Sequence, residues 1–455
     1  FQFDQGRDAL VIRRLLTEGK LFLVGPVTGL EGIFLGPLLY YLLTPFYWLG
    51  QGNPVIPAMF LSGIQIITIY FLYLLGRTVS KFTAFLAVGI YAFSQPIFWL
   101  NRWLSNPPPV MIGSTILVYA LYQILQGKPK FWVLASLALG FSLQFEVASA
   151  VFFLPAIFIF LLWQWKSRPS VKVALLSLVI FFFSLLPQIW FDFRHDHIMS
   201  KNIYKQLLNS QSFSSFDKSF FKNRLNLFRQ SFGNKLFAHD GQLIVIATPI
   251  LILFGALTLK HWLSPLTKIL IIFILSQLVP LLFFRGNHGN VWDYHFSGNF
   301  PLFILLISAW FGSTFKTSLG KIITFIFIVL FLKSNYQVAY NSLVAGIEGP
   351  IHISLGNQKQ AVNWVYQDAA NHPFNVDVYV PPVIPYAYDY LFAWIGDGFG
   401  LYPQNDQVSL LYTLYEQDPP HPERLDAWLK RQQGIAKVES EIRFGGITVQ
   451  RRARL

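Results

Sequence analysis

The chain has 455 residues, a formal net charge of +13, and a composition that is 54% hydrophobic and only 13% charged. Soluble domains carry about 25% charged residues, so this composition excludes an ordinary soluble protein, and its apolar content excludes disorder. The absence of cysteine excludes a disulfide framework, thiolate zinc sites and cysteine nucleophiles. The sequence therefore predicts a polytopic membrane protein.

Residues 1–53 precede the first long apolar run and are predicted to be external to the membrane. They contain an amphipathic stretch, residues 8–16, and an apolar run, residues 35–49, which Pro37 and Pro45 interrupt. This pattern is typical of helices that lie on a membrane surface. A first transmembrane helix before Phe1 is expected to carry the segment across the membrane, and a cleaved signal peptide is the alternative.

Ten apolar runs follow, most of them near the roughly 20 residues needed to cross a bilayer. They cover residues 54–76, 82–100, 108–126, 131–145, 147–165, 173–191, 242–258, 268–284, 297–314 and 322–338. One set of alternate loops contains Lys and Arg but no Asp or Glu, so the positive-inside rule predicts that these loops are cytoplasmic. The C-terminal tail is then predicted to be external, like residues 1–53.

From about residue 340 the composition becomes that of a soluble domain, with 9 basic and 12 acidic residues in 340–455. Residues 376–380 and 409–415 are predicted strands, 423–432 a helix, and Gly445-Gly446 the turn of a closing hairpin. Residues 394–398 are predicted to form a turn. The predicted fold class is a polytopic all-α membrane protein with a small C-terminal external α/β domain, divided into residues 1–53, 54–339 and 340–455.

The first chemical candidate is the acidic motif FDQGRDA, residues 3–9. Asp4 and Asp8 are four residues apart and share one face of a helix, with Arg7 beside them. A carboxylate in this position is able to act as a general base toward a hydroxyl or to hold a metal ion. The alternative is a structural role, with Asp4 as the N-cap of a helix and Asp8 solvated.

The run FDQGRDALVIRRLL at residues 3–16, followed by GPVTGLEGIFLGPLLYYLLTPFYWLG at 25–50, resembles the first external loop of a known family. These are the polyprenol-phosphate-dependent glycosyltransferases of the protein O-mannosyltransferase (glycosyltransferase family 39) and aminoarabinose-transferase type, which have the GT-C fold. Their loop continues to a Pro-Leu-Tyr-Tyr-like element, which Pro37, Tyr40 and Tyr41 match here. The layout of about eleven spans and an external C-terminal domain also resembles this family.

The resemblance implies that Asp4 is the catalytic base. A sugar joined to a lipid phosphate has a good leaving group, so the acceptor hydroxyl attacks the anomeric carbon while Asp4 takes its proton, and the configuration inverts. This chemistry differs from paired-carboxylate glycoside hydrolysis, in which an acid protonates the leaving oxygen. Two positions depart from the family pattern: Gln5 stands where many members have Glu, and the loop at residues 101–107 contains no carboxylate. These departures leave open whether a divalent metal is required, and no other cofactor is predicted.

A leaving lipid phosphate needs cations at the outer boundary of the membrane, and the candidates are Arg102, Arg194, Arg285 and His288. The alternative for each is that the side chain extends to lipid headgroups. A second group, Asp192, His195, Asp196 and His197, is close in sequence and has side chains of the kind that ligate metals.

Further substrate-binding candidates lie where apolar runs meet the external side. Glu146 stands alone between two apolar runs, where a carboxylate is costly; it either serves a function or marks a tight external turn. Asp293, Tyr294 and His295 precede another run and either line the substrate cavity or belong to an aromatic belt.

Residues 192–240 form a predicted polar loop with eight Lys or Arg and four Asp. The loop either binds anionic headgroups or acts as a gate over the entrance for a lipid-linked sugar. The positive charge lies at membrane boundaries, which disfavours nucleic acid as a partner. The absence of a phosphate-cradling glycine loop disfavours a nucleotide-sugar donor.

The first functional hypothesis is an integral-membrane glycosyltransferase that uses a polyprenyl-phosphate sugar donor on the external side of a bacterial plasma membrane. Its partners would be the donor, membrane lipids and an acceptor that is a protein, a lipid or a glycan. The second hypothesis is a transporter or flippase for lipid-linked sugars, and the third is a scaffold that presents the C-terminal domain. The gathering of acidic residues at one face favours the enzyme.

Overall fold

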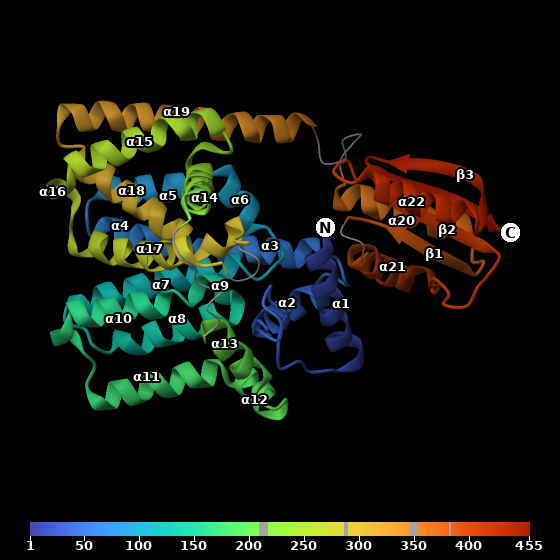
Figure 1. Cartoon of the computed structure of the whole chain (residues 1–455), viewed down its shortest axis with the longest axis horizontal. Helices are drawn as coiled ribbons and strands as arrows, with labels where there is room; N and C mark the ends of the chain where they lie inside the picture. The colour runs from blue at the N-terminus through green and yellow to red at the C-terminus, as the bar shows by residue number, and fades with distance from the viewer. Residues whose placement is uncertain (209–216, 286–289, 346–352, 382–383) are drawn as a thin grey trace. The chain divides into compact units, whose positions relative to one another are not determined.

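The computed structural model describes residues 1–208, 217–285, 290–345, 353–381 and 384–455. These residues divide into two compact units (Figure 1). The sheet unit comprises residues 1–20, 44–56 and 339–455, and the helical unit comprises residues 21–43 and 57–338. The division shows that the beginning of the chain and the segment 44–56 pack with the C-terminal part, although more than 280 residues lie between them in sequence.

In chain order the elements are α1 (Phe3–Glu18), α2 (Leu38–Leu49), α3 (Val55–Ile64), α4 (Ile66–Arg77), α5 (Lys81–Phe93), α6 (Gln95–Asn101), α7 (Pro108–Leu125), α8 (Phe131–Phe145), α9 (Val147–Ala150), α10 (Phe153–Trp163), η1 (Trp165–Ser167), α11 (Val171–Ser184), α12 (Leu186–Arg194), α13 (Ile198–Leu208), α14 (Lys218–Phe237), α15 (Gly241–Leu257), α16 (Leu259–Trp262), α17 (Pro265–Phe283), η4 (Asp293–Asn299), α18 (Phe300–Thr314), α19 (Ser318–Ala345), α20 (Leu355–Ala369), β1 (Phe374–Tyr379), α21 (Tyr386–Phe399), β2 (Leu410–Glu416), α22 (Pro422–Gln433), β3 (Ala436–Phe444) and β4 (Ile447–Arg454).

The ten predicted apolar runs all fall on helices of this series. In the described part of the chain, five helices are long and apolar enough to cross a membrane, or up to eight when each bent pair counts as one span. The apolar helices at 131–145 and 147–163 are shorter than a span. The predicted count of ten is thus higher than the length and composition of the helices support, because apolar runs in sequence do not reveal bends or short helices.

The bends have local causes. Helices α5 and α6 meet at 68° and α11 and α12 at 61°, and Pro96 and Pro187 stand in the first turn of the second helix of each pair. A proline lacks the amide proton that would continue the preceding helix, so a break there is expected. Helices α14 and α15 meet at 102°, where Ala238 and His239 adopt positive φ values.

The predicted polar loop at 192–240 is a correction of the sequence analysis. The described residues of this region are mostly helical, in α13 and α14. Helix α14 begins after Asp217, whose carboxylate accepts hydrogen bonds from the amides of Ser219 and Phe220. An N-cap of this kind satisfies amides that have no partner inside the helix. The charged residues here therefore lie largely on helices.

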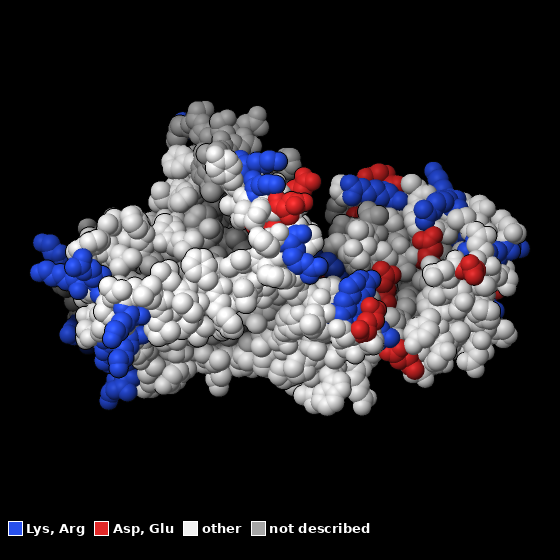
Figure 2. All heavy atoms as spheres, turned by 90° about the horizontal axis from the view of Figure 1, so that it is seen from below, with Lys and Arg blue, Asp and Glu red and all other residues white. Residues whose placement is uncertain are grey.

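Charge is distributed unevenly over the helical unit. Figure 2 shows Lys and Arg side chains gathered at one end of this unit, with no Asp or Glu among them on the face that is shown. Alternate loops that carry only basic residues are expected to produce this arrangement, because alternate connections of antiparallel helices meet at the same end.

The sheet unit contains a four-stranded sheet in the order β1-β2-β4-β3. Strands β1 and β2 are parallel, whereas β4 is antiparallel to both β2 and β3. Its core contains Tyr366, Phe374, Tyr388 and Tyr412, which are at most 1% exposed. The predicted strands, the helix at 423–432 and the hairpin at Gly445 are thus confirmed.

Two parts of the sheet unit were not expected from the sequence. Helices α20 and α21 belong to it, and residues 394–398, predicted to be a turn, form the last turns of α21. Gly396 and Gly398 suggested a turn, but the helix continues to Phe399 and ends at Gly400, which has a φ of 63°. The packing of α21 within the unit outweighs the low helix propensity of these glycines.

Candidate active site

The acidic motif lies in the first two turns of α1. Gln5 Oε1 accepts a hydrogen bond from the Gln2 amide at 2.7 Å, which caps the start of the helix. Gln5 therefore has a structural role for which glutamine and glutamate are equally suited. The helix ends at Gly19, whose φ of 64° favours glycine.

Arg7 connects the two carboxylates of the motif. Its Nη1 lies 2.8 Å from Asp4 Oδ1 and its Nε lies 2.9 Å from Asp8 Oδ1. The Asp4 side chain is 47% exposed, whereas that of Asp8 is 4% exposed. The predicted structural alternative is wrong in both details, because Gln2 rather than Asp4 is the N-cap and Asp8 is buried. Asp4 is the carboxylate that reaches the surface of this unit.

The Tyr-Tyr element of the resemblance lies in the first turn of α2, in the helical unit. The Tyr41 hydroxyl donates to the Phe22 carbonyl at 2.7 Å and accepts from the Phe22 amide at 2.9 Å. The Tyr40 ring is 3% exposed and meets the Phe22 ring edge to face at 6.2 Å. Both tyrosines thus hold the loop before α2 in place.

Glu146 is buried at the junction of α8 and α9. Its Oε1 accepts a hydrogen bond from the Ala148 amide at 3.1 Å, which caps α9. This contact gives Glu146 a structural role, and a role in substrate binding stays a prediction. A carboxylate that caps a helix end satisfies an amide that the helix itself leaves without a partner.

The predicted phosphate-binding cations have different surroundings. Arg102 is exposed, with its guanidinium 5.0 Å from the Trp99 ring. Arg194 is exposed at the end of α12. Arg285 lies 3.4 Å from Asp217 and 4.7 Å from the Phe220 ring. The remaining candidate, His288, lies outside the described residues.

The group of acids and histidines at 192–197 is explained by helix geometry. The Asp192 carboxylate accepts hydrogen bonds from the amides of Met199 and Ser200 at 2.7 and 3.2 Å, which caps α13. His195 instead stacks on Phe191 with 4.1 Å between ring centroids. In the described ranges, no three His, Asp or Glu side chains come together in a way that would hold a metal ion.

Asp293, Tyr294 and His295 begin η4 and are held there by neighbouring side chains. Lys235 Nζ lies 2.7 Å from Asp293 Oδ2. The Tyr294 ring meets the Trp103 ring edge to face at 5.6 Å. The His295 carbonyl accepts from Gln277 Nε2 at 2.7 Å. Lys235 was not among the sequence candidates. Its side chain is only 5% exposed and lies over the Phe300 ring, and neither its burial nor this contact is visible in the sequence.

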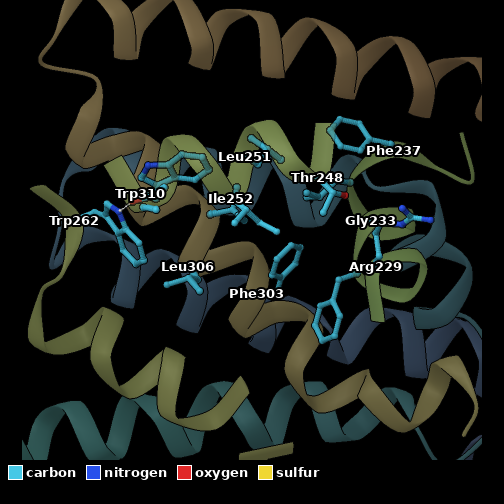
Figure 3. Close-up of a pocket in the computed structure, with 15 residues that line it drawn as sticks. Arg229, Gly233, Phe237, Thr248, Leu251, Ile252, Trp262, Phe303, Leu306 and Trp310 are labelled. Atoms are coloured by element: carbon cyan, nitrogen blue, oxygen red, sulfur yellow. Dashed lines mark hydrogen bonds between the residues drawn. The ribbon is translucent and has the colours of Figure 1, made fainter. Parts of the chain in front are cut away.

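A second feature that the sequence did not reveal is an apolar cavity of about 310 Å³ between α14, α15, α16 and α18. Figure 3 shows Trp262 and Trp310 toward one side of this cavity and Arg229 toward the other, with Phe303 and Leu306 between. The Arg229 Nη2 donates to Asn226 at 2.6 Å. Its Nε is buried and has no hydrogen-bond partner among the described residues. The cavity thus combines apolar walls with a cation at one side.

Comparison with known proteins supports the resemblance. The model of the family described as dolichyl-phosphate-mannose-protein mannosyltransferase matches residues 35–191. No curated protein sequence matches the chain significantly.

Two solved structures are similar to the chain over its whole length. The crystal structure of ArnT from Cupriavidus metallidurans bound to undecaprenyl phosphate is 11% identical, with a TM-score of 0.62, and the match covers 99% of this chain and 93% of that one. The apo state of the same protein has a TM-score of 0.60 with the same coverage and identity. The chain therefore has the GT-C fold of ArnT, and its resemblance to the polyprenol-phosphate-dependent glycosyltransferases is confirmed.

Proposed function

We propose that the chain is an integral-membrane glycosyltransferase that takes a sugar from a polyprenyl-phosphate donor and transfers it to an acceptor hydroxyl. The observation that carries this proposal is the ArnT-like fold, which extends over almost all of the chain. The match of residues 35–191 to a mannosyltransferase family supports it independently, because that match is one of sequence. The undecaprenyl phosphate bound to ArnT supports a lipid-phosphate donor.

The proposed reaction is a single displacement at the anomeric carbon. The acceptor oxygen forms a bond to this carbon, the bond from the carbon to the phosphate oxygen breaks, and the acceptor proton passes to Asp4. The lipid phosphate leaves as an anion, and the configuration at the carbon inverts. Asp4 suits the role of base because its carboxylate is about half exposed, and Arg7 fixes the position of that carboxylate.

The leaving phosphate develops negative charge that cations stabilise. Arg102, Arg194 and Arg285 are the described candidates, and all three retain partial or full exposure. The acidic motif and the sheet unit are proposed to face the external side of the membrane, with the basic loops in the cytoplasm.

The apolar cavity of the helical unit is proposed to hold part of the polyprenyl chain. Its lining is almost wholly apolar, so it matches the isoprene units of the chain, which gain packing contacts there relative to a less well packed surface. Arg229 at one side of the cavity is a suitable partner for a lipid phosphate.

The proposal is tested by sugar transfer from radiolabelled polyprenyl-phosphate sugars to membrane acceptors, with the chain inserted in lipid. We expect Asp4→Asn to lower the transfer rate by about 10²- to 10⁴-fold, the usual contribution of a general base. Glu18→Gln is the matched control, because Glu18 is an exposed acid at the other end of the same helix. Transfer by the unmodified chain and by Glu18→Gln, with loss in Asp4→Asn, would support the proposal.

Two other outcomes would contradict it. Equal transfer by Asp4→Asn would remove Asp4 as the base. Movement of the labelled lipid across the bilayer without transfer from any of a panel of sugar donors would favour the flippase instead.

A further inference from the structure

The role of the C-terminal domain follows from how α1 is held in the sheet unit. Gly6 lies between the two acidic residues of the motif, and a Cβ there would overlap the backbone of Tyr386 and Ala387 at the start of α21. The Phe3 and Tyr386 rings pack at 4.9 Å. The turn of α1 that carries Asp4 is therefore in direct backbone contact with α21.

The far end of the same interface is closed by a bidentate ion pair. Arg13 Nη1 lies 2.6 Å from Asp397 Oδ2, and Arg13 Nη2 lies 2.7 Å from Asp397 Oδ1. The Tyr402 hydroxyl donates to Asp397 Oδ1 at 2.6 Å. Two parallel hydrogen bonds between a guanidinium and a carboxylate fix both distance and orientation, which one hydrogen bond does not. We name Arg13, Asp397 and Tyr402 the clamp.

Helix α21 also holds the segment 44–56. The Trp394 Nε1 donates to the Gln51 carbonyl at 2.7 Å, and the Tyr390 hydroxyl donates to the Gly52 carbonyl. The Tyr390 ring lies 5.9 Å from the buried Tyr47 ring. One helix of the C-terminal domain thus holds two separate parts of the predicted external segment, residues 1–53.

We propose that α21 holds α1 in the position and orientation that catalysis requires. In this proposal, Arg13 and Asp397 are positioning residues that set the orientation of Asp4. This inference rests on the proposed function, in which Asp4 is the base. A base acts only within hydrogen-bond reach of the proton that it takes, and a displacement of about 1 Å costs about 10²-fold in rate. The C-terminal domain then contributes to the transfer by fixing α1, without contacting the sugar.

The test compares steady-state transfer by the full chain with that of Asp397→Asn, which keeps the side-chain shape but weakens the clamp. We expect kcat to fall by about tenfold or more while the KM for the lipid-linked donor stays the same. Asp397→Glu, which restores a carboxylate, should recover part of the lost kcat. Arg13→Lys, which keeps the charge but loses the forked hydrogen bonds, should behave like Asp397→Asn.

The matched control is Arg431→Gln. Arg431 forms an exposed ion pair with Asp377 at 3.0 Å in the same unit, away from α1. Its loss should leave kcat and KM unchanged, because exposed ion pairs contribute little.

A second readout does not depend on activity. The chain contains no cysteine, so the substitutions Glu18→Cys on α1 and Ala427→Cys on α22 allow two spin labels to be attached at exposed positions. The distance distribution between the labels, measured by pulsed electron paramagnetic resonance in lipid nanodiscs, should be narrow in the parent and broader in Asp397→Asn.

The combined outcomes separate the two proposals. A broader distance distribution together with a lower kcat in Asp397→Asn supports the proposal that α21 positions α1. A broader distribution with an unchanged kcat, or an unchanged distribution, overturns it. If the parent transfers no sugar although its distance distribution is narrow, the proposed function fails. The catalytic role of the contact between α21 and α1 then fails with it.

Discussion

The two acidic residues of the motif have different chemical environments, although they are one helical turn apart. Asp8 is buried and bound to Arg7, whereas Asp4 is bound to the same arginine but remains about half exposed. A group that is enclosed in the unit does not reach an acceptor hydroxyl. Within the proposed function, we therefore propose Asp4 alone as the base and Asp8 as the residue that holds Arg7. The burial of Asp8 thus supports the assignment of the base to Asp4 that the family resemblance implies.

At the same scale, the clamp makes the stability of the sheet unit depend on pH. Hydrogen bonds from Arg13, with that from Tyr402, lower the pKa of Asp397 below its usual value, against the opposing effect of burial. A carboxyl whose pKa is lowered on folding stabilises the fold above its unfolded pKa of about 3.9, and this contribution is lost as the pH falls through the folded pKa.

We expect Asp397→Asn to lower the thermal unfolding midpoint at pH 7, and this difference to become smaller as the pH falls below about 3.9. The measurement is circular dichroism of the two proteins in detergent across this range. A difference between the two midpoints that does not change with pH would contradict this role for the ionised carboxylate.

At the scale of elements, three helices of the sheet unit, α1, α20 and α21, end in the left-handed conformation, and two of the three end at a glycine. Helices α1 and α21 end at Gly19 and Gly400, which adopt positive φ values. Helix α20 ends at Ala370, whose φ of 45° is unfavourable for a residue with a Cβ. No glycine marks this helix end in the sequence.

We expect Ala370→Gly to stabilise the sheet unit by about 0.5–1 kcal/mol, because glycine adopts the left-handed conformation without steric cost. The matched control, Ala427→Gly at an exposed position inside α22, should destabilise it by about 1 kcal/mol. Chemical denaturation of both variants measures the two changes. A loss of stability in Ala370→Gly would show that strain at this helix end is not relieved.

At the scale of the whole molecule, each unit has its own internal design. The sheet unit joins the acidic helix to a small α/β domain, and the helical unit contains an apolar cavity with a cation at one side. Such a division suits a lipid-linked donor, since the donor has a polar sugar phosphate at one end and an apolar polyprenyl chain at the other. The polar transfer chemistry and the apolar chain each require a different environment.

Filling the cavity tests its proposed occupant. Leu306→Trp should raise the KM for a long-chain polyprenyl donor by about tenfold, or about 1.4 kcal/mol, because the indole would fill space that the chain is proposed to occupy. The KM for a short-chain analogue of the same sugar should not change. Leu319→Trp, at a position on α19 that is 59% exposed, is the control. An equal increase in KM for both donors would show that the cavity does not hold the distal part of the chain.

The sequence by itself determined the apolar helices, the strands of the C-terminal domain and the family resemblance. These features depend on local composition and periodicity, and on a motif that is contiguous in the chain. The tertiary structure alone decided that Asp8 is buried, that 394–398 is helical, that Lys235 meets Asp293, and that α14, α15, α16 and α18 line a cavity. The contact between Arg13 and Asp397 joins residues that are 384 positions apart. Such contacts depend on how distant elements pack, and no local pattern of residues encodes that packing.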